Sequence, residues 1–284
     1  MRNLLSANIA RLRKNILFWL GIAAMAGYAV IMLVSWYRTN QIILQSDRPE
    51  MAMSTERFLF TFTGLIGILL AAFVGLFLGR EYSDGVLRSK LTVGHSRSAV
   101  YLANLIAAVI ASFLMCLTYV AVMLAVGVPV YGPATTEPLI LLRQLAEALA
   151  MCMAHCALFT LVAMNWSNKA LSATACILGV LALMMATAVM LNHLSEPEFY
   201  TDMVFDEGLQ DWVENGLRPN PFYVSGPLRA VYRFFCDVLP TGQGLQLTSI
   251  KAAGRSSLLP LYSLAVTAVS TVIGLLLFRR KDIK

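Results

Sequence analysis

Charged residues are scarce in this sequence. They make up 13% of the 284 positions, whereas soluble domains carry about 25%. Hydrophobic residues make up 58%, and they lie in long blocks rather than being spread along the chain. The mean hydropathy is +0.69. This composition excludes a soluble enzyme, a nucleic-acid-binding domain and a disordered regulator, so the net charge of +6 indicates the Lys/Arg bias of cytoplasmic loops in a membrane protein.

The sequence also lacks the motifs of covalent chemistry. The pattern G-x-x-x-x-G-K-[ST] does not occur, and no glycine is followed directly by lysine, so the chain has no P-loop for ATP. The metalloprotease motif H-E-x-x-H and the nucleophile motif G-x-S-x-G are missing as well, and no paired carboxylates lie in an apolar block. We therefore expect a chain that is not an enzyme, with no catalytic residues and no cofactor of its own.

The five cysteines do not indicate a disulfide framework. Four of them fall inside the apolar blocks, and Cys236 alone lies in a long connection. Cys152, His155 and Cys156 are close enough in sequence to raise the alternative of a soft-metal site. Because membrane helices use cysteine and methionine freely as packing residues, we expect no metal site here.

Six apolar stretches are long enough to cross a membrane, which takes roughly 20 helical residues. The predicted spans are residues 16–36, 58–78, 99–126, 139–164, 170–191 and 258–278. They are too long and too uniformly apolar for barrel strands, and only a helix satisfies its own backbone in lipid. The sequence therefore predicts an all-α membrane protein with a single transmembrane domain over residues 1–284. The first block is too long for the apolar core of a signal peptide and is expected to remain as an anchor.

The distribution of lysine and arginine predicts the orientation. On one side lie Arg2, Arg11, Arg13, Lys14, Arg80, Arg88, Lys90, Arg97, Lys169, Arg279, Arg280, Lys281 and Lys284. The short connections on the opposite side carry only Arg38, Arg48 and Arg57, and the connection 192–257 is too long to obey the rule. Both termini are therefore expected in the cytoplasm, with the chain in the plasma or inner membrane.

Two charged segments adjoin the spans on that side. Residues 1–15 place Ile9 among other apolar residues at helical spacing, with Arg11, Arg13 and Lys14 opposite, which predicts an interfacial helix. The alternative is a positive flank that only orients the first span. Residues 79–98 keep apolar positions on one helical face and predict a short surface helix, with Glu81, Asp84, Arg88 and Arg97 available to a partner. The alternative is a solvated turn.

The connection 192–257 is long enough to form a structure of its own, outside the cytoplasm. Ser195-Glu196-Pro197-Glu198 has the pattern of a helix start and is followed by an acidic stretch up to Asn215. A second helix is predicted from Pro227 to Pro240. We expect a helical region that packs on the outer ends of the spans, with substrate gating as the alternative.

The fourth predicted span carries polar residues that are costly in a membrane. Arg143 and Glu147 are four positions apart, so they share a helix face and can neutralise each other, and His155 follows two turns later. One interpretation is a structural pair buried between helices. The other is a polar wall of a translocation path.

Several segments together carry a resemblance to a known family. They are the basic N-terminal segment, the six spans, the run G-R-E-Y-x-x-G-x-L-R-x-x-L at Gly79–Leu91, the sequence Leu239-Pro240-Thr241-Gly242 before the last span, and the tail F-R-R-K-D-I-K. In this combination the chain resembles the ABC-2-type permease subunits of ATP-driven exporters, over nearly its whole length.

The resemblance implies roles for particular residues. Tyr82–Leu91, with Glu81 at its start, would be the coupling helix that fits a groove on a separate ATPase subunit, and Ile9–Lys14 would belong to an interfacial connecting helix. The implied coupling residues are Glu81, Tyr82, Asp84, Gly85, Leu87 and Arg88. Residues 195–240 would be external helices that cap the exit. The implied complex contains two permease chains, identical or homologous, and two ATPase chains that bind ATP and Mg²⁺.

Two other functions remain open from the residues alone. An ion-coupled secondary transporter would use Arg143, Glu147 and His155, although no inverted repeat is evident. A non-transporting membrane scaffold or sensor would use the connection 192–257 to bind a ligand or a protein.

Overall fold

The computed structural model of the chain describes residues 2–46, 51–166, 168–206, 211–248 and 256–281. Within these ranges, six helical segments are long and apolar enough to cross a membrane, which confirms the predicted number of spans. They are α2 (Ile16–Leu44), α4 (Ile66–Ser83), the continuous run Arg97–Tyr131, α8 (Pro138–Asn165), α9 (Lys169–Ser195) and α12 (Leu259–Arg280). The run Arg97–Tyr131 consists of α6 (Arg97–Val122), a π-helical turn η3 (Met123–Gly127) and α7 (Val128–Tyr131). Arg48 and Lys284, used above for orientation, lie outside the described residues.

The second span differs most from its prediction. It was expected over residues 58–78, but α4 begins at Ile66, after a short helix α3 (Glu56–Leu59) and a 3-10 turn η2 (Thr61–Gly64). The hydroxyls of Thr61 and Thr63 donate to the carbonyls of Phe58 and Phe60, three residues earlier. Such local bonds compete with a regular helix and explain the late start. At its other end α4 runs through Ser83, into the segment predicted as a connection.

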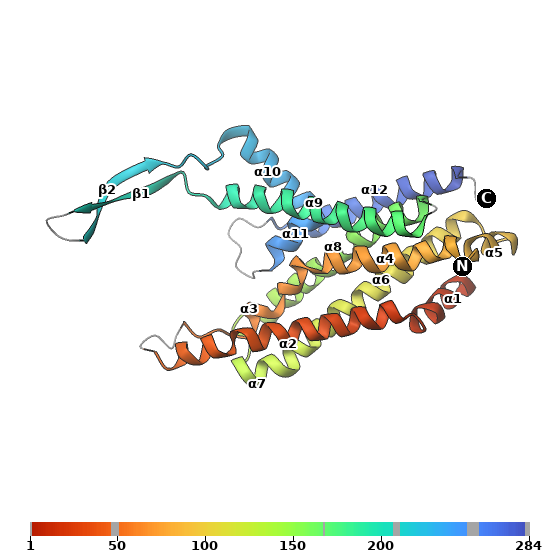
Figure 1. Cartoon of the computed structure of the whole chain (residues 1–284), viewed down its shortest axis with the longest axis horizontal. Helices are drawn as coiled ribbons and strands as arrows, with labels where there is room; N and C mark the ends of the chain where they lie inside the picture. The colour runs from red at the N-terminus through yellow and green to blue at the C-terminus, as the bar shows by residue number, and fades with distance from the viewer. Residues whose placement is uncertain (1, 47–50, 167, 207–210, 249–255, 282–284) are drawn as a thin grey trace.

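The helices run alternately up and down, so α2, α6 and α9 all begin at the same end of the bundle (Figure 1). Each of the three is capped by a side chain: the oxygens of Asn15, Ser96 and Asn168 accept from backbone N–H groups one turn into the helix, at 2.8–3.2 Å. Helix α1 (Arg2–Arg13), helix α5 (Val86–Thr92) and the last turn of α12 lie at this end too (Figure 1). We call it the basic end, since Arg11, Lys14, Arg80, Arg88, Arg97, Arg279 and Arg280 are all there, and call the opposite end the hairpin end.

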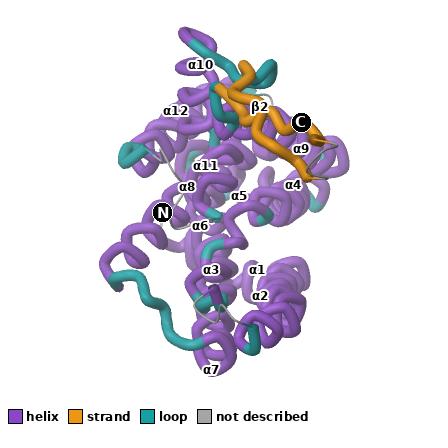
Figure 2. Tube along the Cα trace, turned by 90° about the vertical axis from the view of Figure 1, so that its left-hand side faces the viewer, coloured by secondary structure: helices purple, strands orange, loops and turns teal. Residues whose placement is uncertain are grey.

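The interior of the bundle is formed by α4, α6 and α8. Helix α8 packs against α4, α6 and α12, while α9 lies along α4 and α2 lies along α6. Seen along the bundle, α6 and α8 lie in the middle (Figure 2). The buried face of α8 contains small and soft side chains, including Ala148, Met151, Cys152 and Cys156. Helices α2, α9 and α12 leave most of their apolar surface exposed, as expected of helices that face lipid.

The helical prediction for residues 195–215 is wrong. Helix α9 ends at Ser195, and a β-hairpin follows, with β1 (Phe199–Asp206) antiparallel to β2 (Asp211–Pro219). Glu196 is extended because it precedes Pro197, which disfavours helical backbone at the residue before it. The strands then use aromatic and β-branched residues, which favour extended backbone. The hairpin projects beyond the bundle (Figure 1). Of the acidic stretch, Glu207 lies outside the described residues.

The second predicted external helix is present as α10 (Gly226–Val238), and it is followed by a buried helix α11 (Pro240–Leu247). The expected stop at Pro240 is therefore the first residue of another helix, a position that proline favours. Helix α11 fits tightly against the bundle. The hydroxyl proton of Thr63 is shared between the carbonyl of Phe60 and the carbonyl of Gly244, each at 2.8 Å, and the amide of Gln144 donates to the carbonyl of Leu247 at 2.7 Å.

Helices α4 and α9 approach closely at Gly75 and Gly79, and the contact at Gly75 generates a prediction. A Cβ added to Gly75 would lie 2.8 Å from Cα of Ala173, so Gly75→Ala must push the helices apart. Overpacking of this kind costs about 1–3 kcal/mol. We expect Gly75→Ala to lower the midpoint of thermal unfolding in detergent. The matched control is Gly179→Ala on α9, where nothing lies within 4 Å, and it should be neutral or slightly stabilising. Equal midpoints for the two variants would contradict the close approach.

Candidate functional site

The candidate site is the elbow between α4 and α5 at the basic end. Helix α4 carries Glu81 and Tyr82 in its last turn, and the chain then reverses at Asp84 and Gly85 before α5 begins at Val86. Gly85 has φ +66°, in the left-handed region that glycine adopts without strain. The single coupling helix expected over Tyr82–Leu91 is therefore wrong in detail: the segment is the end of one helix, a turn and a second helix.

Glu81 is the most deeply buried charge of this elbow. Its side chain is 0% exposed, and one carboxylate oxygen accepts from both Arg11 on α1 and Lys90 on α5. The other oxygen accepts from the amide of Asn104 on α6 at 2.6 Å. A buried carboxylate is tolerated only when it is paired and hydrogen-bonded in this way.

Two asparagines complete the arrangement. The amide of Asn8 on α1 donates to the side-chain oxygen of Asn104 at 2.7 Å, and Lys90 donates to the side-chain oxygen of Asn8 at 3.0 Å. We call Asn8, Arg11, Glu81, Lys90 and Asn104 the Glu81 network. It joins α1, α4, α5 and α6. Burial lowers the pKa of Lys90 below its ordinary value of 10.5, while the negative charge of Glu81 acts in the opposite direction.

In the structure, some of the residues predicted for partner contact are buried and others are exposed. Glu81 was expected to be available to a partner, and this is wrong because its carboxylate is enclosed by the chain itself. Leu87, at 1% exposure, packs inward as well. Asp84, Gly85 and Arg88 are exposed on the turn and on α5.

Helix α1 supplies the other predicted residues. Leu4, Asn8 and Leu12 are buried, and the helix packs against α6. Ile9 is half-buried, whereas Arg13 and Lys14 are exposed. Of the predicted residues of this segment, Arg11 is the one that forms an ion pair with the elbow: it pairs with Glu81, and its guanidinium carbon lies 4.0 Å from the ring centroid of Phe77.

The elbow is also tied to the end of the last span, which sequence reasoning missed. The hydroxyl of Tyr82 donates to the carbonyl of Met164 on α8. Lys281 donates to the hydroxyl of Tyr82 at 3.0 Å and lies 4.2 Å from the centroid of its ring. Arg97, which was expected to face a partner, instead donates to the last carbonyls of α12, including those of Phe278 and Arg279 at 3.3 and 3.2 Å. A cation at the C-terminus of a helix is favoured by the helix dipole.

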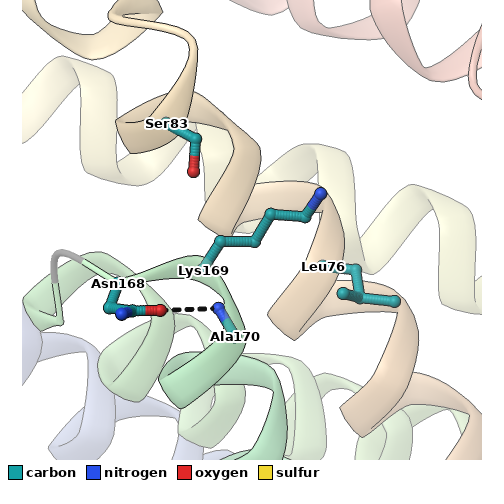
Figure 3. Close-up of a pocket in the computed structure, with 5 residues that line it drawn as sticks. All are labelled: Leu76, Ser83, Asn168, Lys169 and Ala170. Carbon is teal, nitrogen blue, oxygen red and sulfur yellow. Dashed lines mark hydrogen bonds between the residues drawn. The ribbon is translucent and has the colours of Figure 1, made fainter.

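A cavity of about 630 Å³ lies beside the elbow, between α4 and α9 (Figure 3). It is lined by Leu76, Ser83, Asn168, Lys169 and Ala170. The side chain of Lys169 extends across it from α9 toward α4, while Asn168 is held by its capping bond to the N–H of Ala170 (Figure 3).

The polar residues of α8 do not gather into one site. Arg143 donates to Glu147 at 3.1 Å, with the arginine side chain 60% exposed and the glutamate 2%. His155 lies two turns further along, about 12 Å by the helical rise. Its Nδ1 is 3.3 Å from the carbonyl of Met151, and its ring packs beside Gly67 and Phe159.

The cysteines of α8 pack against the neighbouring helix α6. The sulfur of Cys152 lies 3.4 Å from that of Cys116 on α6, and Cys156 lies against the carbonyl of Ala108 on the same helix. Among the residues that the structure describes, no three His, Cys, Asp or Glu side chains are grouped closely enough to hold a metal ion.

Comparison with known protein families identifies a match over most of the chain. The family model described as "ABC-2 family transporter protein" matches residues 4–184, which include α1, the elbow and the first five spans up to the middle of α9. No curated protein shows significant similarity to the chain.

The first prediction from this site concerns the buried carboxylate. Glu81→Gln removes the negative charge and leaves Arg11 and Lys90 facing each other in a buried place. Removing one partner of a fully buried pair costs about 3–5 kcal/mol, and we expect about 2–3 kcal/mol here because Arg11 is 28% exposed. The measurement is denaturant or thermal unfolding of the purified chain. Asp84→Asn, the same change at an exposed position three residues away, should alter stability by less than about 0.5 kcal/mol. If both variants unfold alike, Glu81 does not hold the elbow together.

The second prediction concerns Lys281. Burial lowers the pKa of its amine from 10.5 to about 8, so it loses its proton in a mildly alkaline range where an ordinary lysine keeps it. Labelling of Lys281 by an acylating reagent should rise with a midpoint near pH 8. Tyr82→Ala removes the ring that covers it and should move the midpoint upward. Because the unfolded chain holds this proton more tightly, the lysine's contribution to stability should increase from about pH 8 toward pH 10.5. A midpoint above pH 10 in the unmodified chain would contradict the burial of Lys281.

Proposed function

Since the chain belongs to the ABC-2 transporter family and is a multi-pass membrane permease, we propose that it forms the translocation pathway of an ATP-driven exporter. Its energy comes from a separate ATPase subunit, which binds ATP and Mg²⁺. The working complex contains two permease chains and two ATPase chains. The basic end faces the cytoplasm of the cell, in agreement with the excess of Lys and Arg there, and the hairpin end faces outward.

The Glu81 network is the observation that supports this proposal most strongly. A permease without a nucleotide site does work only if motion of its partner biases its conformations. For that, the partner's contact surface must be mechanically joined to the spans. The network provides this joint, since a displacement of α5 acts through Lys90 and Glu81 on α4, and through Asn8 and Asn104 on α1 and α6.

The exposed part of the elbow is the proposed contact surface. Asp84 and Arg88 carry opposite charges on the turn and on α5, and both side chains are exposed. The buried side chain of Leu87 packs the other face of the same helix against the protein interior. We assign partner recognition to Asp84 and Arg88, and the transmission of force to Glu81, Tyr82 and Lys90.

The hydrogen bonds of helix α11 at the hairpin end favour a gate that opens outward. Helix α11 lies buried at this end, held by Thr63 of η2 and Gln144 of α8. The amide of Gln243 in the same helix donates to the carbonyl of Asp237, and its side-chain oxygen accepts from Ser263 on α12 at 2.5 Å. A short polar helix bonded to several spans would have to shift when a pathway opens there. The secondary-transporter alternative is not favoured, because Arg143, Glu147 and His155 do not converge.

The test of the coupling role is charge reversal on the exposed elbow. Asp84→Lys with Arg88→Glu keeps the net charge and leaves the Glu81 network intact. Juxtaposed like charges at an interface cost several kcal/mol. We therefore expect co-purification with the P-loop ATPase subunit, and transport-linked ATP hydrolysis by the complex, to fall by about tenfold or more.

A matched reversal at the other end serves as the control. Arg38→Glu with Glu137→Lys changes two exposed charges near the hairpin end, and it should leave co-purification with the ATPase unchanged. Equal losses in the two double variants, or normal assembly and ATP hydrolysis by the Asp84→Lys/Arg88→Glu chain, would contradict the proposed contact surface. Transport by the purified chain in liposomes without any ATPase would overturn the proposed function as a whole.

A further inference from the structure

A second, smaller cavity lies at the basic end, between the α1–α2 corner and the end of α4. Its volume is about 180 Å³, and its lining includes Arg11, Lys14, Phe77, Arg80, Glu81 and Asp84. Pockets for drug-sized molecules measure about 300–1,000 Å³, so this one suits a single small group rather than a bulky substrate. It is distinct from the larger cavity between α4 and α9.

The charges around this cavity favour an anion. Three cations line it, from α1, from the α1–α2 corner and from α4. Of the two carboxylates, Glu81 is already engaged by Arg11, Lys90 and Asn104, and Asp84 is exposed on the turn. The positive charges that face the cavity are thus only partly balanced by the chain itself.

The unsatisfied donors of Arg11 are the most specific indication of an anion-binding site. One of its terminal nitrogens donates to Glu81, while Nε and the other terminal nitrogen, Nη2, are buried and have no hydrogen-bond partner among the described residues. Leaving a buried N–H donor without an acceptor costs about 1–3 kcal/mol, and more when the group is charged. A guanidinium edge with two free donors matches the oxygens of a phosphate or a carboxylate.

The residues beside the cavity are of the kinds that concentrate at the depth of lipid headgroups. Helix α2 begins immediately after Lys14 and Asn15, and its first residues Ile16, Trp19 and Leu20 are apolar and exposed, each by more than half. The indole N–H of Trp19 donates to the carbonyl of Arg13 at 2.8 Å. Tryptophan concentrates at the boundary between the hydrocarbon core and the headgroups, so a group bound beside Arg11 would be level with lipid phosphates.

We propose that this cavity binds the phosphate group of an anionic phospholipid from the leaflet at the basic end. Arg11 would receive the phosphate oxygens on its free donors, Lys14 and Arg80 would supply additional positive charge, and the lipid chains would lie along the exposed apolar start of α2. Free inorganic phosphate has the same anionic oxygens, so the experiment compares the two sources.

The test is lipid binding to the purified full-length chain in neutral detergent, measured by native mass spectrometry. We expect phosphatidylglycerol to occupy one site saturably and phosphatidylcholine to bind it at least tenfold more weakly. Lys14→Gln with Arg80→Gln should raise the dissociation constant for phosphatidylglycerol by about tenfold or more, because each cation near an anionic lipid surface contributes a severalfold gain. These two side chains are exposed and take no part in the Glu81 network, and unfolding midpoints report whether the variant is folded.

Two further variants make the result specific. Arg2→Gln with Arg280→Gln removes two exposed cations of the same end that do not line the cavity, and it should change binding less than twofold. Lys14→Arg with Arg80→Lys keeps both charges and should retain binding.

Saturable binding of inorganic phosphate that depends on Lys14 and Arg80, without binding of phosphatidylglycerol, would support the phosphate site and overturn the lipid assignment. Equal affinity for the two lipids, or equal loss in both Gln variants, would overturn the proposal. No ATPase is present in this experiment, so its failure would leave the coupling proposal standing.

Discussion

A single buried carboxylate, that of Glu81, dictates how the basic end of this protein is built. An ionised group without water is stable only with opposite charges and hydrogen-bond donors around it. The chain meets this requirement with residues from three other helices: Arg11 of α1, Lys90 of α5 and Asn104 of α6. If any of these helices moved away, the buried carboxylate would lose an ion pair or a hydrogen bond. The elbow, the N-terminal helix and the ends of two spans are therefore held in one arrangement, and a force applied to α5 is shared among them rather than absorbed by a flexible turn.

The sequence predicted the six spans and their order because lipid imposes a simple condition, about 20 apolar residues that satisfy their own backbone. It also located the elbow, from the charged run at Gly79–Leu91. It did not predict that Glu81 faces inward, since its partners come from positions up to 70 residues away in the chain and helical periodicity reports only neighbours. The hairpin was missed for a local reason. Ser195-Glu196-Pro197-Glu198 fits a helix start by pattern, but α9 already occupies this position and ends there, and the aromatic and β-branched residues that follow favour strands.

The contacts at the basic end and the contacts of helix α11 differ in the kind of bond that they use. At the basic end, charged side chains bond to one another and to helix termini, as Arg97 does with the end of α12. Helix α11, by contrast, is joined to η2 and α8 by neutral side chains that bond to its backbone carbonyls, those of Thr63 and Gln144. Charge-assisted bonds are roughly twice as strong as neutral ones. A structure joined in this way resists deformation at the basic end and yields first around α11, so motion introduced at the elbow would open the bundle at the opposite end.

The charge balance of the Glu81 network connects the elbow with the small cavity beside it. Within the network one carboxylate faces two cations, Arg11 and Lys90, and burial already lowers the pKa of Lys90. An anion bound next to Arg11 would compensate the excess positive charge and occupy donors that the chain leaves free. It would therefore stabilise the arrangement in which Arg11 of α1 reaches Glu81 of α4, relative to any arrangement that separates the two residues. A ligand shifts a conformational equilibrium only by its difference in affinity for the two states. An anionic lipid held by both helices satisfies that condition, so the composition of the surrounding leaflet would set how readily the elbow moves.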